Sequence, residues 1–104
     1  MKYYAVAEID ITDPRWIAAY VQNTTKLVER HGGRYLARTS NFEKLEGVRT
    51  PPQIYLIIEW PSKEAAEAFY ESEDYRPLRE SRQGGSSGDF FLVAGEDVTG
   101  LAEV

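Results

Sequence analysis

The sequence predicts an α+β sandwich in which a four-stranded antiparallel sheet carries helices on one face, with the chain order βαββαβ. Three observations support this fold class. Apolar and polar residues alternate from Tyr3 to Ile11, which is typical of a strand with one buried face. Two stretches repeat apolar residues at helical spacing, and three short apolar runs are bounded by Gly, Pro and Ser. The length of 104 residues predicts a single domain over 1–104, with an acidic tail at 95–104.

The first helix is predicted between Asp13 and Gly32. Asp13 is a residue type that caps helices, and Pro14 suits the first helical position, where a missing N–H costs no hydrogen bond. Gly32 is expected to end the helix, because the left-handed conformation that often follows a helix is inexpensive for glycine. The apolar residues between these ends predict a buried stripe made of Trp16, Ile17, Tyr20, Val21, Leu27 and Val28.

The middle of the chain predicts two neighbouring strands. Residues 34–39 form the first of them, and residues 53–60 form the second, which is the most apolar run and is therefore expected at the centre of the sheet. Residues 40–52 connect them as a long hairpin loop containing a short extended piece at 42–46. Pro61 ends the central strand.

The last third of the chain predicts a helical region and a final strand at 89–94. Ser62 caps a short helix. A further helical stretch ends near Arg82, and Pro77 lies either in its first turn, after an Asp74 cap, or at a kink. The Gly- and Ser-rich residues 83–88 predict a flexible loop.

Sorting the strands by side-chain face gives two apolar faces. We expect helices to cover the face made of Ala5, Ala7, Ile9, Ile54, Leu56, Ile58, Trp60, Phe90 and Leu92. The other face carries seven large apolar side chains, and the chain has no further element to cover them: Tyr4, Val6, Leu36, Tyr55, Ile57, Phe91 and Val93. Monomers rarely expose an apolar patch of that size, so we expect a homodimer that packs sheet on sheet about a twofold axis.

Several short motifs resemble those of a small bacterial family. The run 31–38, His-Gly-Gly-Arg-Tyr-Leu-Ala-Arg, is similar to its Gly-Gly-Arg-Phe-Leu-x-Arg stretch, and residues 45–47 match its Leu-Glu-Gly. Residues 57–62 resemble its apolar-apolar-Glu-Phe-Pro-Ser. Its Tyr-x-Ser-x-x-Tyr followed by Arg is matched at Tyr70, Ser72, Tyr75 and Arg82. The chain thereby resembles the family called domain of unknown function 1330, within the dimeric α/β-barrel superfamily.

This resemblance implies a ferredoxin-like fold and a dimeric barrel, and it implies no particular activity. Relatives in the superfamily include cofactor-free monooxygenases, dehydratase-like enzymes and haem proteins, so the fold alone does not determine a function. The sequence departs from the family pattern at residues 39–41, where glycines usually stand, at Pro77, and at Gly95-Glu96, where the order is reversed.

Composition narrows the classes of partner. The net charge of −5 disfavours binding to nucleic acids and to anionic membranes, and no apolar run is long enough to span a bilayer. Cysteine is absent and His31 is the single histidine, so we expect neither disulfides nor a metal or other cofactor. The chain starts directly with a strand pattern and shows no signal peptide, which predicts a cytoplasmic protein.

Glu59 is the candidate catalytic residue, because it is a carboxylate in the most apolar strand, on the face expected at the dimer contact. An unpaired buried charge is costly, so Glu59 must be paired, protonated or solvated. We place Arg34 and Arg38 on the same face as its partners. Either Glu59 has a raised pKa and acts in acid–base chemistry, or it belongs to a structural ion pair.

The candidate ligand-binding residues are Tyr20, Arg38, Tyr75 and Arg82. In this superfamily pockets lie between sheet and helices, so the aromatic residues there either line a pocket or form plain core. Arg82 either binds a ligand anion or is a solvated charge on the helix surface.

Three other polar groups are weaker candidates. Glu8 and Asp89 either lie together as an acid–base pair, at the same end of the sheet as Glu59, or flank solvent. His31 is either a base or a residue at the end of the first helix.

Three hypotheses about function follow. The first is a cofactor-free homodimeric enzyme that acts on a small organic molecule by acid–base chemistry, with Glu59, Arg38, Tyr20 or Tyr75 in the site. The second is a non-catalytic module that binds a small ligand in the same pocket. The third is a structural dimer without a cavity. The sequence leaves open whether the protein is an enzyme.

Overall fold

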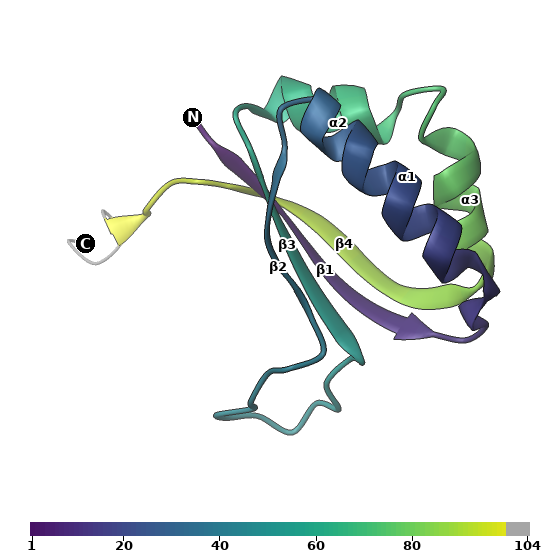
Figure 1. Cartoon of the computed structure of the whole chain (residues 1–104). Helices are drawn as coiled ribbons and strands as arrows, with labels where there is room; N and C mark the ends of the chain where they lie inside the picture. The colour runs from purple at the N-terminus through teal and green to yellow at the C-terminus, as the bar shows by residue number, and fades with distance from the viewer. Residues whose placement is uncertain (100–104) are drawn as a thin grey trace.

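The computed structural model describes residues 1–99. Its elements follow the predicted order, with the 3-10 turn η1 (Pro14–Trp16) before the first helix and two short helices before the last strand: β1 (Tyr3–Ile11), α1 (Ile17–Arg30), β2 (Arg34–Thr39), β3 (Ile54–Trp60), α2 (Lys63–Tyr70), α3 (Arg76–Gly84) and β4 (Ser86–Ala94). All three α-helices lie on one side of the sheet and leave the other side open (Figure 1). The fold is therefore the predicted α+β sandwich.

The sheet is antiparallel with the strand order β2-β3-β1-β4, which puts the apolar strand β3 in the interior as predicted. Residues of β1 that face the helices pair with residues of β3 and β4 that do the same, as in Ala5 with Ile58 and Leu92. The core between this face and the helices is made of Ala7, Ile9, Leu27, Val28, Leu56, Ile58, Trp60, Ala66, Phe69 and Tyr75.

The ends of the helices confirm most of the predicted signals. The Asp13 side chain accepts a hydrogen bond from the Arg15 backbone N–H at 3.1 Å, but it caps the turn η1, and α1 itself begins after Trp16 without a side-chain cap. Ser62 caps α2 by accepting from the Ala65 N–H at 3.1 Å. Gly32 has a φ of +89°, the left-handed conformation expected after the helix. Pro77 lies in the first turn of α3, but its cap is Tyr75 and not Asp74.

The segment 83–88 is not the flexible loop that its composition predicts. Helix α3 continues to Gly84, and β4 begins at Ser86, three residues before the predicted start. Gly85 is buried between them, and its carbonyl oxygen accepts from the backbone N–H groups of Thr12 and Asp13 and from the indole Nε1 of Trp16, at 2.9–3.0 Å. A glycine is needed here because a Cβ would overlap the Trp16 indole.

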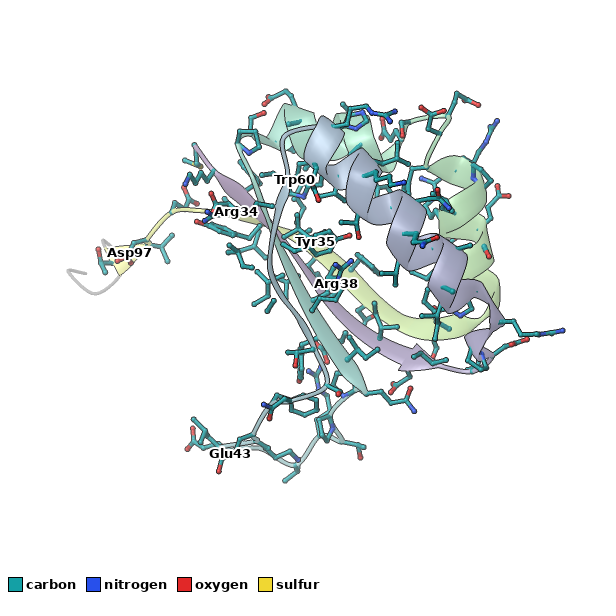
Figure 2. All side chains as sticks on the ribbon, in the orientation of Figure 1. Arg34, Tyr35, Arg38, Glu43, Trp60 and Asp97 are labelled. Carbon is teal, nitrogen blue, oxygen red and sulfur yellow. The ribbon has the colours of Figure 1, made fainter. Side chains whose placement is uncertain are left out.

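A β-bulge in β2 corrects the predicted orientation of Arg38. Arg34 pairs with Glu59 on the open face, but the register shifts between Tyr35 and Ala37, so that Arg38 pairs with Leu56. A one-residue shift moves every following side chain to the opposite face. Figure 2 shows Tyr35 and Arg38 between β2 and the helices, whereas Arg34 lies toward the other side.

The open face consists of three rows of side chains that run across the sheet. The central row is apolar and contains Ala37, Ile57, Val6 and Phe91; the flanking rows are Arg34, Glu59, Tyr4 and Val93, and Thr39, Tyr55, Glu8 and Asp89. Three apolar side chains of this part of the sheet are strongly exposed: Phe91 at 58%, Val93 at 47% and Leu36 at 46%. These residues agree with the predicted second face of the sheet. The exception is Arg38, which was predicted on this face and lies on the other.

The connection between β2 and β3 extends beyond the end of the sheet (Figure 1) and contains no strand, so the extended piece predicted at 42–46 is not paired. Phe42 anchors the connection through an edge-to-face contact with Tyr55, with ring centroids 4.8 Å apart. Of the predicted tail, Gly95 still bonds to the sheet through the Lys2 carbonyl at 2.8 Å, and residues 100–104 lie outside the described part.

Candidate ligand-binding site

A cavity of about 350 Å³ lies between the helix-facing side of the sheet and the helical layer. Its walls are mostly aromatic and aliphatic, with contributions from all four strands and from α1 and α2. The residues that line it include Tyr20, Thr24, Tyr35, Ile58, Trp60, Phe69, Tyr70, Tyr75, Phe90 and Leu92. Its presence contradicts the hypothesis of a structural dimer without internal space. The volume is at the lower end of the range for small-molecule sites.

Two of the sequence-predicted residues meet at this cavity. The hydroxyl oxygens of Tyr20, on α1, and Tyr75, just before α3, lie 2.6 Å apart and share one hydrogen bond. Tyr75 is 1% exposed. The pKa of Tyr20 is raised far above its usual value. Burial is the largest cause of this rise, and the neighbouring Tyr75 is the second. Tyr20 therefore stays protonated at neutral pH and can donate a hydrogen bond, but it is a poor donor of a whole proton and cannot act as a base there.

Arg82 lies beside the tyrosine pair but does not itself line the cavity. It is 6% exposed, so it is not a solvated surface charge. Its guanidinium carbon is 4.2 Å from the centroid of the Phe90 ring. Its buried Nε and Nη2 groups have no hydrogen-bond partner within residues 1–99. Burial by itself lowers the pKa of Arg82, but the Tyr75 and Tyr20 hydroxyls raise it more, so the pKa ends above its ordinary value.

Arg38 lies on the same side of the sheet as the cavity, with its guanidinium over the ring of Tyr35. Its guanidinium carbon is 3.9 Å from the centroid of the Tyr35 ring, and its Nη1 donates to the Thr25 hydroxyl at 2.9 Å. Burial raises the pKa of Tyr35, although Arg38 opposes that shift. Arg38 thus fixes one wall of the cavity and does not itself line it.

Glu59 lies on the opposite face of the sheet from the cavity. Its carboxylate accepts from Lys2 Nζ at 2.7 Å and from Arg34 Nη2 at 3.3 Å. Its pKa is lowered, first by the hydrogen bond from Lys2 and also by the charges of Lys2 and Arg34. The hypothesis of a raised pKa is therefore wrong, and the ion pair with Arg34 is confirmed. Arg38 is not a partner, because the bulge turns it to the other face.

The remaining polar candidates lie outside the cavity. Glu8 and Asp89 are directly opposite each other on β1 and β4, as predicted, but at the other end of β1 from Glu59. Glu8 pairs with Arg49 at 2.8 Å. His31 follows the end of α1, where its Nδ1 lies 2.9 Å from the Leu27 carbonyl oxygen.

Sequence reasoning missed two features of the site. Thr24 is 2% exposed, lines the cavity, and its hydroxyl has no partner within residues 1–99. The sequence could have identified Thr24, because a residue four positions after Tyr20 lies on the same face of the helix. Glu67 and Glu71 also line the cavity, from the exposed side of α2.

Two further properties of residues 1–99 bear on the site. No group of three or more His, Cys, Asp or Glu side chains in this part of the chain is placed so as to hold a metal ion. None of the helices described here combines the length and the apolar character needed to cross a membrane.

Comparison with known proteins gives a family and a fold. Residues 2–96 match the model of a family described as domain of unknown function (DUF1330). No curated protein matches the chain.

Solved structures with the same fold include a protein of unknown function from Rhodopseudomonas palustris, 16% identical over 92% of this chain and 83% of that chain, with a TM-score of 0.76. SnoaB, a cofactor-independent oxygenase from Streptomyces nogalater, is 14% identical over 92% and 94% of the two chains (TM-score 0.64). An antibiotic biosynthesis monooxygenase is 18% identical over 93% and 100% (TM-score 0.52). At these identities the likeness shows the ferredoxin-like fold alone.

Proposed function

The chain belongs to the DUF1330 family, and from that premise we propose that it is a homodimer that binds a small, mostly apolar organic molecule between its sheet and its helices. The observation that carries this proposal is the aromatic cavity of about 350 Å³ with the hydrogen-bonded hydroxyls of Tyr20 and Tyr75 in its wall. Apolar cavities with a few convergent polar groups are the usual form of a small-molecule site.

We further propose that the tyrosine pair acts on the ligand as a hydrogen-bond donor in acid–base chemistry. A protonated hydroxyl in a site that excludes water stabilises negative charge that develops on a ligand oxygen. Such a donor assists the loss of a proton from the carbon next to a carbonyl. Water takes the proton, the C–H electron pair forms a C=C bond, and the carbonyl π electrons move onto the oxygen, which becomes an enolate oxygen. This role moves the proposed chemistry from Glu59 to Tyr20 and Tyr75.

One structural relative gives support for chemistry of this kind. SnoaB is described as a cofactor-independent oxygenase, which indicates that this fold can support reactions on organic molecules without a bound cofactor. For the present chain a cofactor-free reaction remains part of the proposal, as does a cytoplasmic location.

The homodimer is proposed from the open face of the sheet. Its central row of Ala37, Ile57, Val6 and Phe91 is apolar, and none of the helices in residues 1–99 covers it. Packing the same face of a second copy against it would bury roughly 800 Å² per partner, the standard size of a stable interface. The charged rows on either side would then form the rim, as interfaces usually have.

Binding without catalysis is the second candidate, and one observation favours it. Within residues 1–99 the only carboxylates that line the cavity are those of Glu67, on α2, and Glu71, directly after it, and both residues are exposed. Residues 1–99 therefore offer no buried base beside the tyrosine pair, and a proton would have to leave to solvent.

The test uses 2-tetralone, an aromatic ketone that exchanges its α-hydrogens for deuterium through an enolate. Binding is followed by proton NMR line broadening, and exchange in D₂O by loss of the α-proton signal. The first candidate expects about a 100-fold faster exchange in the presence of the protein, lost in the Tyr20→Phe/Tyr75→Phe double variant. Binding without faster exchange supports the second candidate. If 2-tetralone, 4-nitrophenolate, 4-nitrobenzoate and 4-nitrotoluene all fail to bind, both candidates are contradicted.

A further inference from the structure

The buried guanidinium of Arg82 narrows the chemical class of the ligand. We propose that the molecule bound in the cavity carries an anionic oxygen, a carboxylate or an ionised phenol or enol, on a flat apolar body. This inference rests on the proposed function, because it concerns the occupant of the same cavity.

Arg82 carries a buried charge without a carboxylate partner in the described chain. An arginine is always protonated, and burying its charge without a counterion is costly. Arg82 is 6% exposed, and no carboxylate within residues 1–99 forms an ion pair with it. Within residues 1–99 the guanidinium lies over the face of the Phe90 ring, which attracts a cation weakly. Arg82 does not itself line the cavity, but Tyr20, Tyr75 and Phe90 beside it do, so an anion bound at that wall would offset the cost.

The tyrosine pair has one hydroxyl proton that its mutual hydrogen bond does not use. Tyr20 and Tyr75 have two O–H donors between them, and their mutual hydrogen bond of 2.6 Å uses one. One proton is left to donate elsewhere. The adjacent Arg82 has only donors, so it cannot accept that proton, and the neighbouring Thr24 hydroxyl forms no hydrogen bond within the described chain. The free hydroxyl proton therefore needs an acceptor, and a ligand oxygen can supply it.

Thr24 adds a second free hydroxyl on the same wall. It lies one helical turn after Tyr20, and its Oγ1 is buried without a hydrogen-bond partner in the described chain. A carboxylate or phenolate oxygen has several acceptor positions and can bind two hydroxyl donors at once. A neutral ketone offers a weaker acceptor and leaves the charge of Arg82 unpaired.

The rest of the cavity sets the shape of the ligand. The rings of Trp60, Phe69 and Tyr75 stack in sequence, with centroid separations of 5.2 and 4.3 Å, which favours a flat apolar body alongside them. Glu67 and Glu71 at the cavity oppose an anion, but their residues are exposed and water screens their charges. Arg82 acts from the protein interior, where charge interactions are stronger.

The experiment compares three single-ring probes of similar shape by isothermal titration calorimetry at pH 8.5: 4-nitrophenolate, 4-nitrobenzoate and the neutral 4-nitrotoluene. The expected result is that at least one anion binds about 10- to 100-fold more tightly than 4-nitrotoluene, the range expected for hydrogen bonds to a charged group. Tighter or equal binding of 4-nitrotoluene overturns the inference and leaves the proposed function standing. Failure of all three probes and of 2-tetralone overturns the proposed function as well.

Two variants test whether Arg82 and the hydroxyls cause the preference. Arg82→Met keeps an unbranched apolar stem and removes the charge, and it should abolish the preference for the anion while 4-nitrotoluene still binds. Tyr20→Phe should lower the preference about tenfold, and it provides the test should the Met variant fail to fold. The matched control is Arg76→Gln, an exposed arginine of the same helix paired with Glu73, which should leave the ratio of affinities unchanged. An unchanged ratio in both Arg82→Met and Tyr20→Phe would overturn the inference.

Discussion

Tyr20 and Tyr75 are separated by 55 positions in the chain, and the hydrogen bond between their hydroxyls joins the first helix to the turn that precedes the last one. Tyr75 is held by its own turn as well, because its backbone N–H donates to the Ser72 hydroxyl at 3.2 Å. The ring of Tyr75 packs on Phe69 in the core. The polar end of the cavity is therefore attached to both helical segments.

We predict that this hydrogen bond is measurable as a coupling between the two residues. Tyr20→Phe and Tyr75→Phe should each lower the free energy of unfolding by about 1 kcal/mol, since each leaves a buried hydroxyl without its partner. In the double variant the losses should not add, and the coupling should be about 1 kcal/mol in a double-mutant cycle measured by urea unfolding. Tyr70→Phe, on the half-exposed side of α2, is the control and should change little. Additive losses would mean that the two hydroxyls do not interact in solution.

The apolar row of the open face predicts a dimer that one substitution can dissociate. Ile57 lies at the centre of the sheet, between Val6 and Ala37. Ile57→Lys should place an unpaired charge in the interface, so that sedimentation velocity at micromolar concentration shows a monomer where the wild type shows a dimer. Val48→Lys, in the exposed connection between β2 and β3, should leave the wild-type mass. A wild-type protein that sediments as a monomer would contradict the proposed assembly.

The ion pairs of Glu59 predict a specific dependence of stability on pH. The pKa of Glu59 is lowered in the folded protein, chiefly by Lys2, so its contribution is present at neutral pH and is lost as the pH falls through the folded pKa. Glu59→Gln should therefore be less stable than the wild type at pH 7, and the difference should shrink on acidification below the ordinary pKa of a glutamate. Thermal melts at a series of pH values measure this convergence. Glu46→Gln, in the exposed loop, should melt like the wild type throughout.

Two adjacent glycines should respond to alanine in opposite directions. At Gly85 a Cβ would overlap the Trp16 indole and come within 2.8 Å of the Asp13 carbonyl oxygen, so Gly85→Ala should destabilise by roughly 1–3 kcal/mol. Gly84 ends α3, and a Cβ there would meet nothing within 4 Å. Gly84→Ala should therefore stabilise by about 0.4–1 kcal/mol, through a lower entropy of the unfolded chain. Urea unfolding of both variants checks the contrast. Equal changes in the free energy of unfolding for the two variants would show that Gly85 is not closely packed against Trp16 in solution.

Most of the fold could be predicted from local signals. Alternation over β1, the helical spacing after Asp13 and the capping residues Ser62 and Gly32 all depend on residues within a few positions of each other. Such signals act through backbone geometry and single hydrogen bonds, so they can be read without knowing the tertiary structure. The segment 83–88 is the exception. Its Gly and Ser content is typical of a loop, but distant contacts from Thr12, Asp13 and Trp16 hold it in place.

The candidate site was only partly predictable. Tyr20, Tyr75 and Arg82 were identified by residue type, and the structure brings them together, with the two tyrosines lining the cavity and Arg82 beside them. Glu59 was placed on the correct face of the sheet, but that face is not the one with the cavity. Arg38 was placed on the wrong face, because a single extra residue in β2 reverses the alternation and the sequence around Leu36 carries no signal for it.

The sequence by itself determined the order of the elements, the two apolar faces of the sheet and the residue types at the site, because periodicity and capping are local properties of the chain. Only the tertiary structure decided that Arg82 is buried beside two tyrosine hydroxyls, that Glu59 is held by Lys2 and Arg34, and that Arg38 turns toward the helices. Burial, pKa and side-chain direction after a bulge depend on groups that are far apart in the chain and meet only when the sheet and the helices pack.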